Sequence, residues 1–188
     1  MFFLLLAFTF FATVFIAFKL RQRRLGRLQG IADRTGLSLQ AGYTGPPELK
    51  GDFHGRTLMM TPTTTRRRSG KQRRTVVVVD VKNPEFLRLR MRRQDHTRHP
   101  FRAAEFEIGD HAFDGRFFIQ SDEPRLVKDV IGHEDVRDAL IRSEIYSAQV
   151  LGPRLEVVYD GRLEDPSQAE IIFSAAARLA DAIDALGA

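Results

Sequence analysis

Residues 1–18 form an unbroken apolar run whose only polar side chains are two threonines. An α-helix of this length is about 27 Å long, close to the thickness of a bilayer's hydrocarbon core, about 30 Å. Basic residues follow the run and none precedes it, whereas a cleaved signal peptide begins with basic residues and has small residues at its cleavage site. The pattern predicts an uncleaved transmembrane helix over residues 1–18, with a cleaved signal peptide as the alternative.

Apolar positions at helical spacing continue beyond this run as far as Gly36, which predicts a basic juxtamembrane helix over residues 19–36. Positive residues beside a membrane span stay on the cytoplasmic side. We therefore expect a single-pass protein of the cell inner membrane or plasma membrane, with its N-terminus outside and its C-terminal domain cytoplasmic. The residues of this segment that we expect to contact anionic lipid or another polyanion are Lys19, Arg21, Arg23, Arg24 and Arg27.

The remaining residues, 37–188, are enough for one ordinary domain with a single core. Alternating apolar positions predict antiparallel strands over much of 48–108, and a helical period replaces them in the later part of the chain. The last helix is expected to open at Asp165-Pro166. The fold class predicted is α+β: an N-terminal transmembrane helix followed by one domain, a meandering antiparallel sheet packed by C-terminal helices.

The chain contains no cysteine, which excludes disulfides, thiolate metal sites and cysteine nucleophiles. Its net charge of +5 conceals two opposite halves. Residues 66–102 hold 13 basic and three acidic residues, whereas residues 103–188 hold eight basic and 18 acidic residues. Two interpretations follow. Either the two halves pair with each other across the fold, or a basic face binds anionic lipid or another polyanion.

The most basic stretch outside the N-terminal region is predicted to be a polar loop over residues 64–74. It is interpreted as a solvated loop, a lipid or polyphosphate contact, or a nucleic-acid contact. Nucleic acid is disfavoured because the stretch has no aromatic side chain on which a base could stack. The residues proposed for lipid or polyanion contact here are Arg66, Arg67, Arg68, Lys71, Arg73 and Arg74.

A second basic pattern places Arg88, Arg90 and Arg92 on one face of a strand. Glu105 and Glu107 alternate in the same way, so we expect them to pair with these arginines across neighbouring strands. The alternative is an exposed arginine ladder that binds a polyanion. A zinc site at the nearby His96 and His99 is disfavoured because arginines surround it, and neither a metal nor a cofactor is expected.

One motif occupies residues 109–117, and its members are Gly109, Asp110, Phe113, Asp114 and Phe117. In the structural interpretation Asp110 caps a short helical turn, and the two phenylalanines anchor it in the core. In the catalytic interpretation Asp110, Asp114 and His133 form an acid–base site of a membrane-tethered hydrolase. The sequence has no nucleophile elbow, P-loop, dinucleotide glycine pattern or zincin helix to support catalysis.

The same motif, continuing into a short strand and Asp122-Glu123-Pro124, resembles that of an uncharacterised family of bacterial single-pass membrane-anchored proteins of unknown function. The resemblance implies no activity and no catalytic residue. The hypothesis we favour is therefore a non-enzymatic, membrane-anchored domain that binds a partner protein or an anionic membrane surface. The alternatives are the tethered hydrolase and polyanion binding by the basic half.

Overall fold

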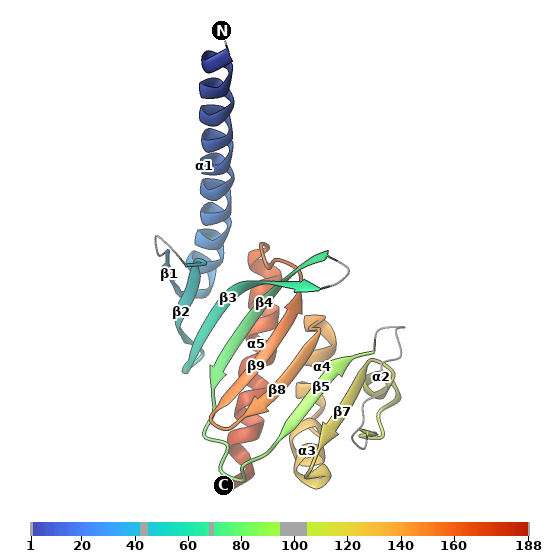
Figure 1. The fold of residues 1–188 in the computed structure, drawn as a ribbon. Coiled ribbons are helices and arrows are strands. Elements are labelled where there is room, and N and C mark those ends of the chain that lie inside the picture. The colour runs from blue at the N-terminus through green and yellow to red at the C-terminus, as the bar shows by residue number, and fades with distance from the viewer. Residues whose placement is uncertain (1, 42–44, 68–69, 95–104, 188) are drawn as a thin grey trace.

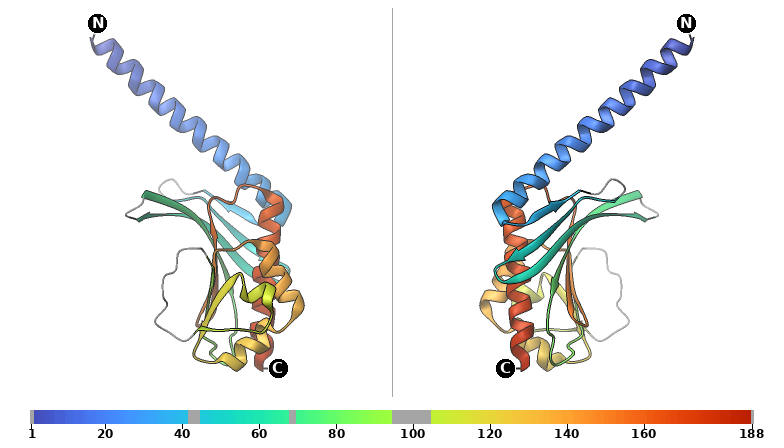
Figure 2. Two further views of the ribbon diagram at one scale, coloured as in Figure 1. Left: turned by 90° about the vertical axis from the view of Figure 1, so that its right-hand side faces the viewer. Right: turned by 90° about the vertical axis from the view of Figure 1, so that its left-hand side faces the viewer.

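The computed structural model describes residues 2–41, 45–67, 70–94 and 105–187, without the side chains of residues 2–10, 65–67 and 105. In this part of the chain nine strands form one antiparallel sheet, and helices cover one of its faces (Figures 1 and 2). The strands are β1 (Ser38–Gln40), β2 (Glu48–Phe53), β3 (Arg56–Arg67), β4 (Gly70–Asp80), β5 (Leu89–Arg93), β6 (Glu105–Phe106), β7 (Phe117–Ser121), β8 (Ser147–Leu151) and β9 (Arg154–Asp160).

The helices are a long N-terminal one, a short one inside the motif, two that follow the motif and a last one that crosses the sheet (Figure 1). They are α1 (Phe2–Thr35), α2 (His111–Asp114), α3 (Pro124–Ile131), α4 (Glu134–Ser143) and α5 (Pro166–Asp184), with a 3₁₀ turn, η1 (Ala185–Gly187), after the last. Helix α5 begins as expected, with Pro166 in its first turn and the Asp165 carboxylate accepting a hydrogen bond from the Ser167 N–H at 2.9 Å. Its buried face includes Ile172, Phe173 and Leu179.

The strand order is β1-β2-β3-β4-β9-β8-β5-β7-β6, so the predicted meander is right only for the first four strands. The β8–β9 hairpin, which comes late in the chain, inserts between β4 and β5. The insertion pairs the valine-rich β4 with β9, where Val77 lies opposite Val157. Both side chains are almost fully buried under the helices, so the valine run of β4 lies near the centre of the sheet.

The predicted loop over residues 64–74 is wrong, because β3 and β4 continue through it as a long hairpin. Ladder pairing persists from Leu58 opposite Val79 out to Arg67 opposite Gly70. The threonine run at 63–65 favours this extension, since β-branched residues fit an extended backbone. Arg66 and Arg67 therefore lie on β3, and Lys71, Arg73 and Arg74 on the paired strand β4, whereas Arg68 is outside the described residues.

Helix α1 has two parts with different surroundings (Figure 1). Its last turns pack against α5 and the first strands, where Leu28, Ile31 and Ala32 are buried. Its first half projects away from the sheet. Phe11, Phe15 and Phe18 there are 70%, 60% and 56% exposed.

The predicted transmembrane helix over residues 1–18 is wrong, because no helix in the described residues has both the length and the apolar character to cross a membrane. The apolar side chains that the structure describes cover only residues 11–18, a length of about 12 Å, before Lys19 follows. The side chains of residues 1–10 lie outside the described part. This finding also overturns the single-pass topology, the N-outside orientation and the assignment to the inner or plasma membrane as an integral protein.

Candidate anion-binding site

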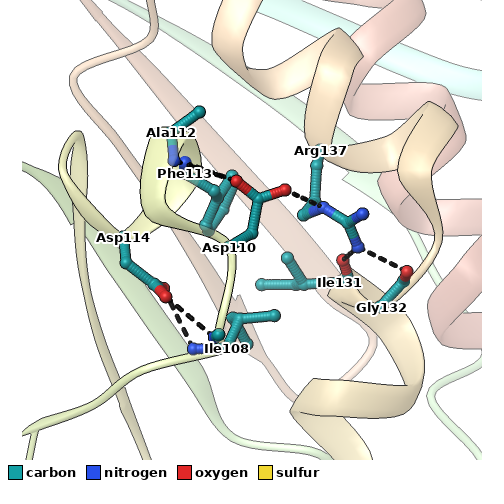
Figure 3. A network of polar contacts seen from close by, with 9 residues as sticks. Ile108, Asp110, Ala112, Phe113, Asp114, Ile131, Gly132 and Arg137 are labelled. Atoms are coloured by element: carbon teal, nitrogen blue, oxygen red, sulfur yellow. Dashed lines mark hydrogen bonds and ion pairs between the residues drawn. The ribbon is translucent and has the colours of Figure 1, made fainter.

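The motif at residues 109–117 forms a structural network (Figure 3). One carboxylate oxygen of Asp110 accepts hydrogen bonds from the Ala112 and Phe113 N–H groups at 3.0 and 3.1 Å, which caps α2. The other accepts from Arg137 Nε of α4 at 2.9 Å. The hydrogen bond from the Phe113 N–H, followed by those from Ala112 and Arg137, lowers the pKa of Asp110 from its usual value, against a smaller opposing effect of desolvation.

The second carboxylate of the motif is held in the same way. Asp114 accepts hydrogen bonds from the Ile108 and Gly109 N–H groups at 2.9 and 2.8 Å, as Figure 3 shows. Phe113 and Phe117 are buried beside each other with ring centroids 4.9 Å apart. The predicted cap at Asp110 is confirmed. Because both carboxylates bind backbone amides, the geometry favours the structural interpretation of the motif over the acid–base site with His133.

The predicted polyanion contacts lie in different places. On α1, Lys19 Nζ lies 5.5 Å from the centre of the Phe15 ring, Arg23 is exposed, and Arg24 and Arg27 face the domain. Lys71 is exposed on β4, as is Arg73. Arg74 turns to the opposite face of the sheet, where its guanidinium lies 4.3 Å from the centre of the Tyr146 ring. The side chains of Arg66, Arg67 and Arg68 lie outside the described residues.

Two of the predicted basic segments, on α1 and on β4, lie close to Arg162, a residue that the sequence analysis did not identify. Arg162 lies just after β9, in a turn that Thr75 of β4 fixes: the Thr75 hydroxyl donates to the Gly161 carbonyl and accepts from the Leu163 N–H, both at 3.1 Å. The Gly161 N–H also donates to the Arg73 carbonyl at 3.0 Å. These bonds hold the turn beside β4, so Arg162 joins the two segments.

We call Arg24, Arg27, Arg73 and Arg162 the arginine cluster. Partial burial, reinforced by the positive charges of the other three arginines, lowers the pKa of Arg162 from its usual value. Arginine side chains keep their positive charge in proteins. Glu164 lies within the cluster and forms an ion pair with Arg27 and another, at 3.9 Å, with Arg162. Four positive charges and one carboxylate leave a net charge of +3 at this point.

A cavity of about 130 Å³ opens beside the arginine cluster, between α1 and the β3–β4 hairpin. Arg24 and Arg162 line it together with Leu28, Met60 and Leu163, three side chains that are almost fully buried. Guanidinium groups bind phosphate and carboxylate oxygens through paired hydrogen bonds. The arrangement is therefore suited to an anion approaching the junction of α1 with the sheet.

The arginine ladder on β5 does not pair as predicted. Strand β7 lies between β5 and β6, so Arg90 is opposite Gln120, and Gln120 in turn is opposite Glu105. The predicted cross-strand pairing of the ladder with Glu105 and Glu107 is therefore wrong. Arg88 instead lies 3.9 Å from Asp122, with both side chains largely exposed.

Within the described residues no group of three or more His, Cys, Asp or Glu side chains could hold a metal ion. The histidines at 96 and 99 lie outside this part of the chain.

Comparisons with known proteins identify the fold only. No protein-family model matches the chain, and no curated protein matches it. The crystal structure of the mycobacterial trehalose monomycolate transport factor A, TtfA, is similar, with a TM-score of 0.57 over 85% of this chain and 92% of that one. The sequence identity is 11%, so the likeness concerns the fold alone. The family resemblance in the motif stays a prediction.

Proposed function

We propose that this protein is a non-enzymatic domain that binds an anionic lipid surface peripherally, through the arginine cluster. The observation that carries the proposal is the convergence of Arg24, Arg27 and Arg73 on Arg162, where the Glu164 carboxylate pairs with Arg27 and Arg162. These residues come from α1, β4 and the turn after β9, so folding is what gathers the charges. Each arginine near an anionic leaflet contributes about 1 kcal/mol of attraction.

The exposed apolar side chains of α1 support the same function. Phe11, Phe15 and Phe18 precede the arginine cluster on one helix and are more than half exposed. Phenylalanines beside arginines are typical of helices that lie at a membrane interface, with aromatic rings at headgroup level and charges on phosphates. This arrangement favours a lipid surface over an acidic protein, because both kinds of contact lie next to each other on α1.

Co-sedimentation with vesicles tests the proposal. The full chain is mixed with phosphatidylcholine vesicles, with or without 30% phosphatidylglycerol, at several salt concentrations. The triple variant R24Q/R27Q/R73Q is compared with R125Q/K128Q/R154Q, which removes three exposed charges elsewhere on the domain. We expect the cluster variant to bind the anionic vesicles at least about tenfold more weakly, because three contributions of about 1 kcal/mol are lost. The control variant should keep most of the affinity.

Three outcomes would count against the proposal. Equal loss in both triple variants would mean that only net charge matters, not the arginine cluster. Equal binding of the wild type to neutral and anionic vesicles, unaffected by salt, would remove the electrostatic role altogether. Weak binding to both kinds of vesicle would point to an acidic protein partner instead.

A further inference from the structure

The cavity of about 130 Å³ beside the arginine cluster lies where α1 meets the β3–β4 hairpin. Helix α1 leaves the domain at the same end of the sheet to which this hairpin extends (Figure 2). Arg24 and Leu28 are four residues apart, so they lie on one face of α1, and both line the cavity. Arg24 is exposed and Leu28 is buried. This helix face therefore supplies a charge at the rim of the cavity and an apolar side chain at its floor.

The floor of the cavity is apolar. Leu28, Met60 and Leu163 line it and are almost fully buried. Among the described lining residues that are buried, Thr75 is the one polar side chain, and its hydroxyl already bonds to the backbone of the turn after β9. A buried water needs two to four polar partners, and an apolar cavity without them stays dry. The floor is therefore suited to hydrocarbon and not to water.

The rim of the cavity is charged. Arg24, Arg162 and Glu164 line it there. The Glu164 carboxylate forms an ion pair with Arg27 and a longer one, at 3.9 Å, with Arg162. Arg24 forms no ion pair with any side chain in the described part of the chain. Two guanidiniums thus face the opening of an apolar cavity, and the carboxylate between them is shared with a third arginine.

The volume of the cavity limits the size of the ligand. An apolar cavity of about 150 Å³ holds a molecule the size of benzene. A cavity of about 130 Å³ therefore has room for roughly five or six carbons of one hydrocarbon chain. Further carbons of a longer chain would lie outside the floor. This size, with the charged rim, indicates a ligand that joins one hydrocarbon chain to an anionic head.

We propose that this cavity binds a phosphate monoester of a single hydrocarbon chain, with the chain on the apolar floor and the phosphate on Arg24 and Arg162. A phosphate monoester carries a charge of about −1.5 to −2 at neutral pH and three acceptor oxygens, which guanidiniums bind through paired hydrogen bonds. The inference rests on the proposed function, because these arginines belong to the arginine cluster. It goes further by placing one lipid chain inside the fold, beneath the surface that approaches the leaflet.

Calorimetric titration of the full chain with soluble probes tests this assignment. The probes are inorganic phosphate, hexanol, hexanoate and the butyl, hexyl and octyl monoesters of phosphate. Each buried methylene is expected to tighten binding about fourfold, so hexyl phosphate should bind roughly tenfold more tightly than butyl phosphate. Octyl phosphate should gain little more, because six carbons fill the cavity. Inorganic phosphate lacks the chain and hexanol lacks the charge, so both should bind more weakly than hexyl phosphate.

Two substitutions separate the chain from the head. Thr64 lines the cavity and is exposed, so Thr64→Phe places a ring over the opening and should raise the dissociation constant of hexyl phosphate at least about tenfold. Thr57→Phe is the matched control, because Thr57 is exposed on the same strand outside the cavity. R162Q should weaken hexyl phosphate about tenfold but not hexanol, since a charge-assisted hydrogen bond is lost. R154Q, elsewhere on the domain, should change neither. Thermal melting of each variant confirms that the fold is intact.

Equal affinity for hexyl phosphate and inorganic phosphate would overturn the inference, as would unaltered binding of hexyl phosphate to Thr64→Phe. If vesicle binding then still depended on the arginine cluster, the cavity assignment alone would fail and the proposed function would stand. Tighter binding of hexyl than of butyl phosphate in a protein that ignores anionic vesicles would have the reverse meaning. Equal affinity for hexanoate and hexyl phosphate would reject the preference for phosphate.

Discussion

At the scale of single residues, Asn83 shows how a local turn becomes a long-range link. Its side-chain amide donates to the carbonyls of Leu87 and Gly152 at 3.1 and 3.0 Å, and its oxygen accepts from the Leu87 N–H at 2.8 Å. Its φ of +45° lies in the left-handed region, which asparagine tolerates better than most residues. We expect Asn83→Ala to lower the free energy of unfolding by about 2–4 kcal/mol in urea titrations.

Asn83→Gly provides the control for that experiment. Glycine keeps the positive φ without strain but loses the same three hydrogen bonds. Its cost should therefore be smaller than that of alanine, and the difference between the two measures the backbone strain. Equal stability of Asn83→Ala and the wild type would contradict the role of the side chain.

Asp184 is the residue whose charge is best coupled to folding. Burial opposes its ionisation, but the hydrogen bonds from Arg56 at 2.6 Å and from the Lys82 and Asn83 N–H groups outweigh this and lower its pKa. A carboxyl group whose folded pKa is lowered stabilises the fold above its unfolded pKa of about 3.9, and this contribution is lost as pH falls through the folded value.

Replacement by asparagine tests this coupling. We expect Asp184→Asn to cost about 2 kcal/mol at pH 7 and less as the pH falls below about 4, because the carboxyl of the unfolded chain takes up a proton first and that of the folded protein follows at lower pH. Asp181→Asn is the matched control, because Asp181 also pairs with Arg56 but is 67% exposed and should cost under about 1 kcal/mol. A cost of Asp184→Asn that does not change with pH would show that its charge is not what stabilises the fold.

At this scale, contacts between residues close together in the sequence could be predicted, and contacts between residues far apart in the sequence could not. The cap at Asp110 was predictable because the N–H groups that donate to its carboxylate belong to the residues two and three positions later. Its partner Arg137 was not, because that contact requires the packing of α4. Arg162 was missed for the same reason: it lies in the acidic half, far along the chain from Arg73, and the hydrogen bonds of Thr75 and of the Gly161 N–H bring it there.

At the scale of elements, the last turns of α1 belong to the core of the domain, whereas its first half does not. Ile31 is fully buried, whereas Phe15 is 60% exposed. Truncating a buried isoleucine to alanine costs about 2–5 kcal/mol, and truncating an exposed side chain costs little. We therefore expect Ile31→Ala to lower the free energy of unfolding by that amount and Phe15→Ala to change it by less than about 0.5 kcal/mol. Similar losses from both would mean that the first half of α1 also packs on the domain.

The alternation of apolar and polar residues located most of the strands along the chain, but it could not predict their order in the sheet. Alternation correctly indicated an extended segment near 48–62, a Val-rich strand and the hairpin around Gly152. It contained no signal for the insertion of β8 and β9 between β4 and β5, which depends on the match of buried valines between distant segments. The pairing of Arg90 with Gln120 instead of Glu105 follows from a second feature of the strand order that alternation did not contain, the position of β7 between β5 and β6.

At the scale of the whole molecule, the two oppositely charged halves of the chain meet across the fold. Ion pairs join the basic residues 66–102 to the acidic residues 103–188 at Arg74–Asp160 and Arg88–Asp122. Earlier arginines also pair with the acidic half, at Arg27–Glu164, Arg34–Glu170, Arg56–Asp181 and Arg56–Asp184. This supports the interpretation in which the halves pair with each other. The second interpretation, a basic face that binds a polyanion, is supported as well. The arginine cluster holds four positive charges, three more than the Glu164 carboxylate neutralises.

This arrangement predicts an acid transition that salt opposes. As the pH falls below about 4, the carboxylates of the second half become protonated, whereas every arginine of the first half keeps its charge. Stabilising pairs are then lost and repulsion among the remaining cations grows, so the melting temperature should fall steeply between pH 5 and pH 3. Adding about 0.5 M NaCl at pH 3 should recover part of the loss, because it screens that repulsion. At pH 7 the same salt should have little effect, since most of these pairs are exposed and contribute little. A melting temperature that salt changes equally at both pH values would mean that repulsion between the basic groups does not drive the acid transition.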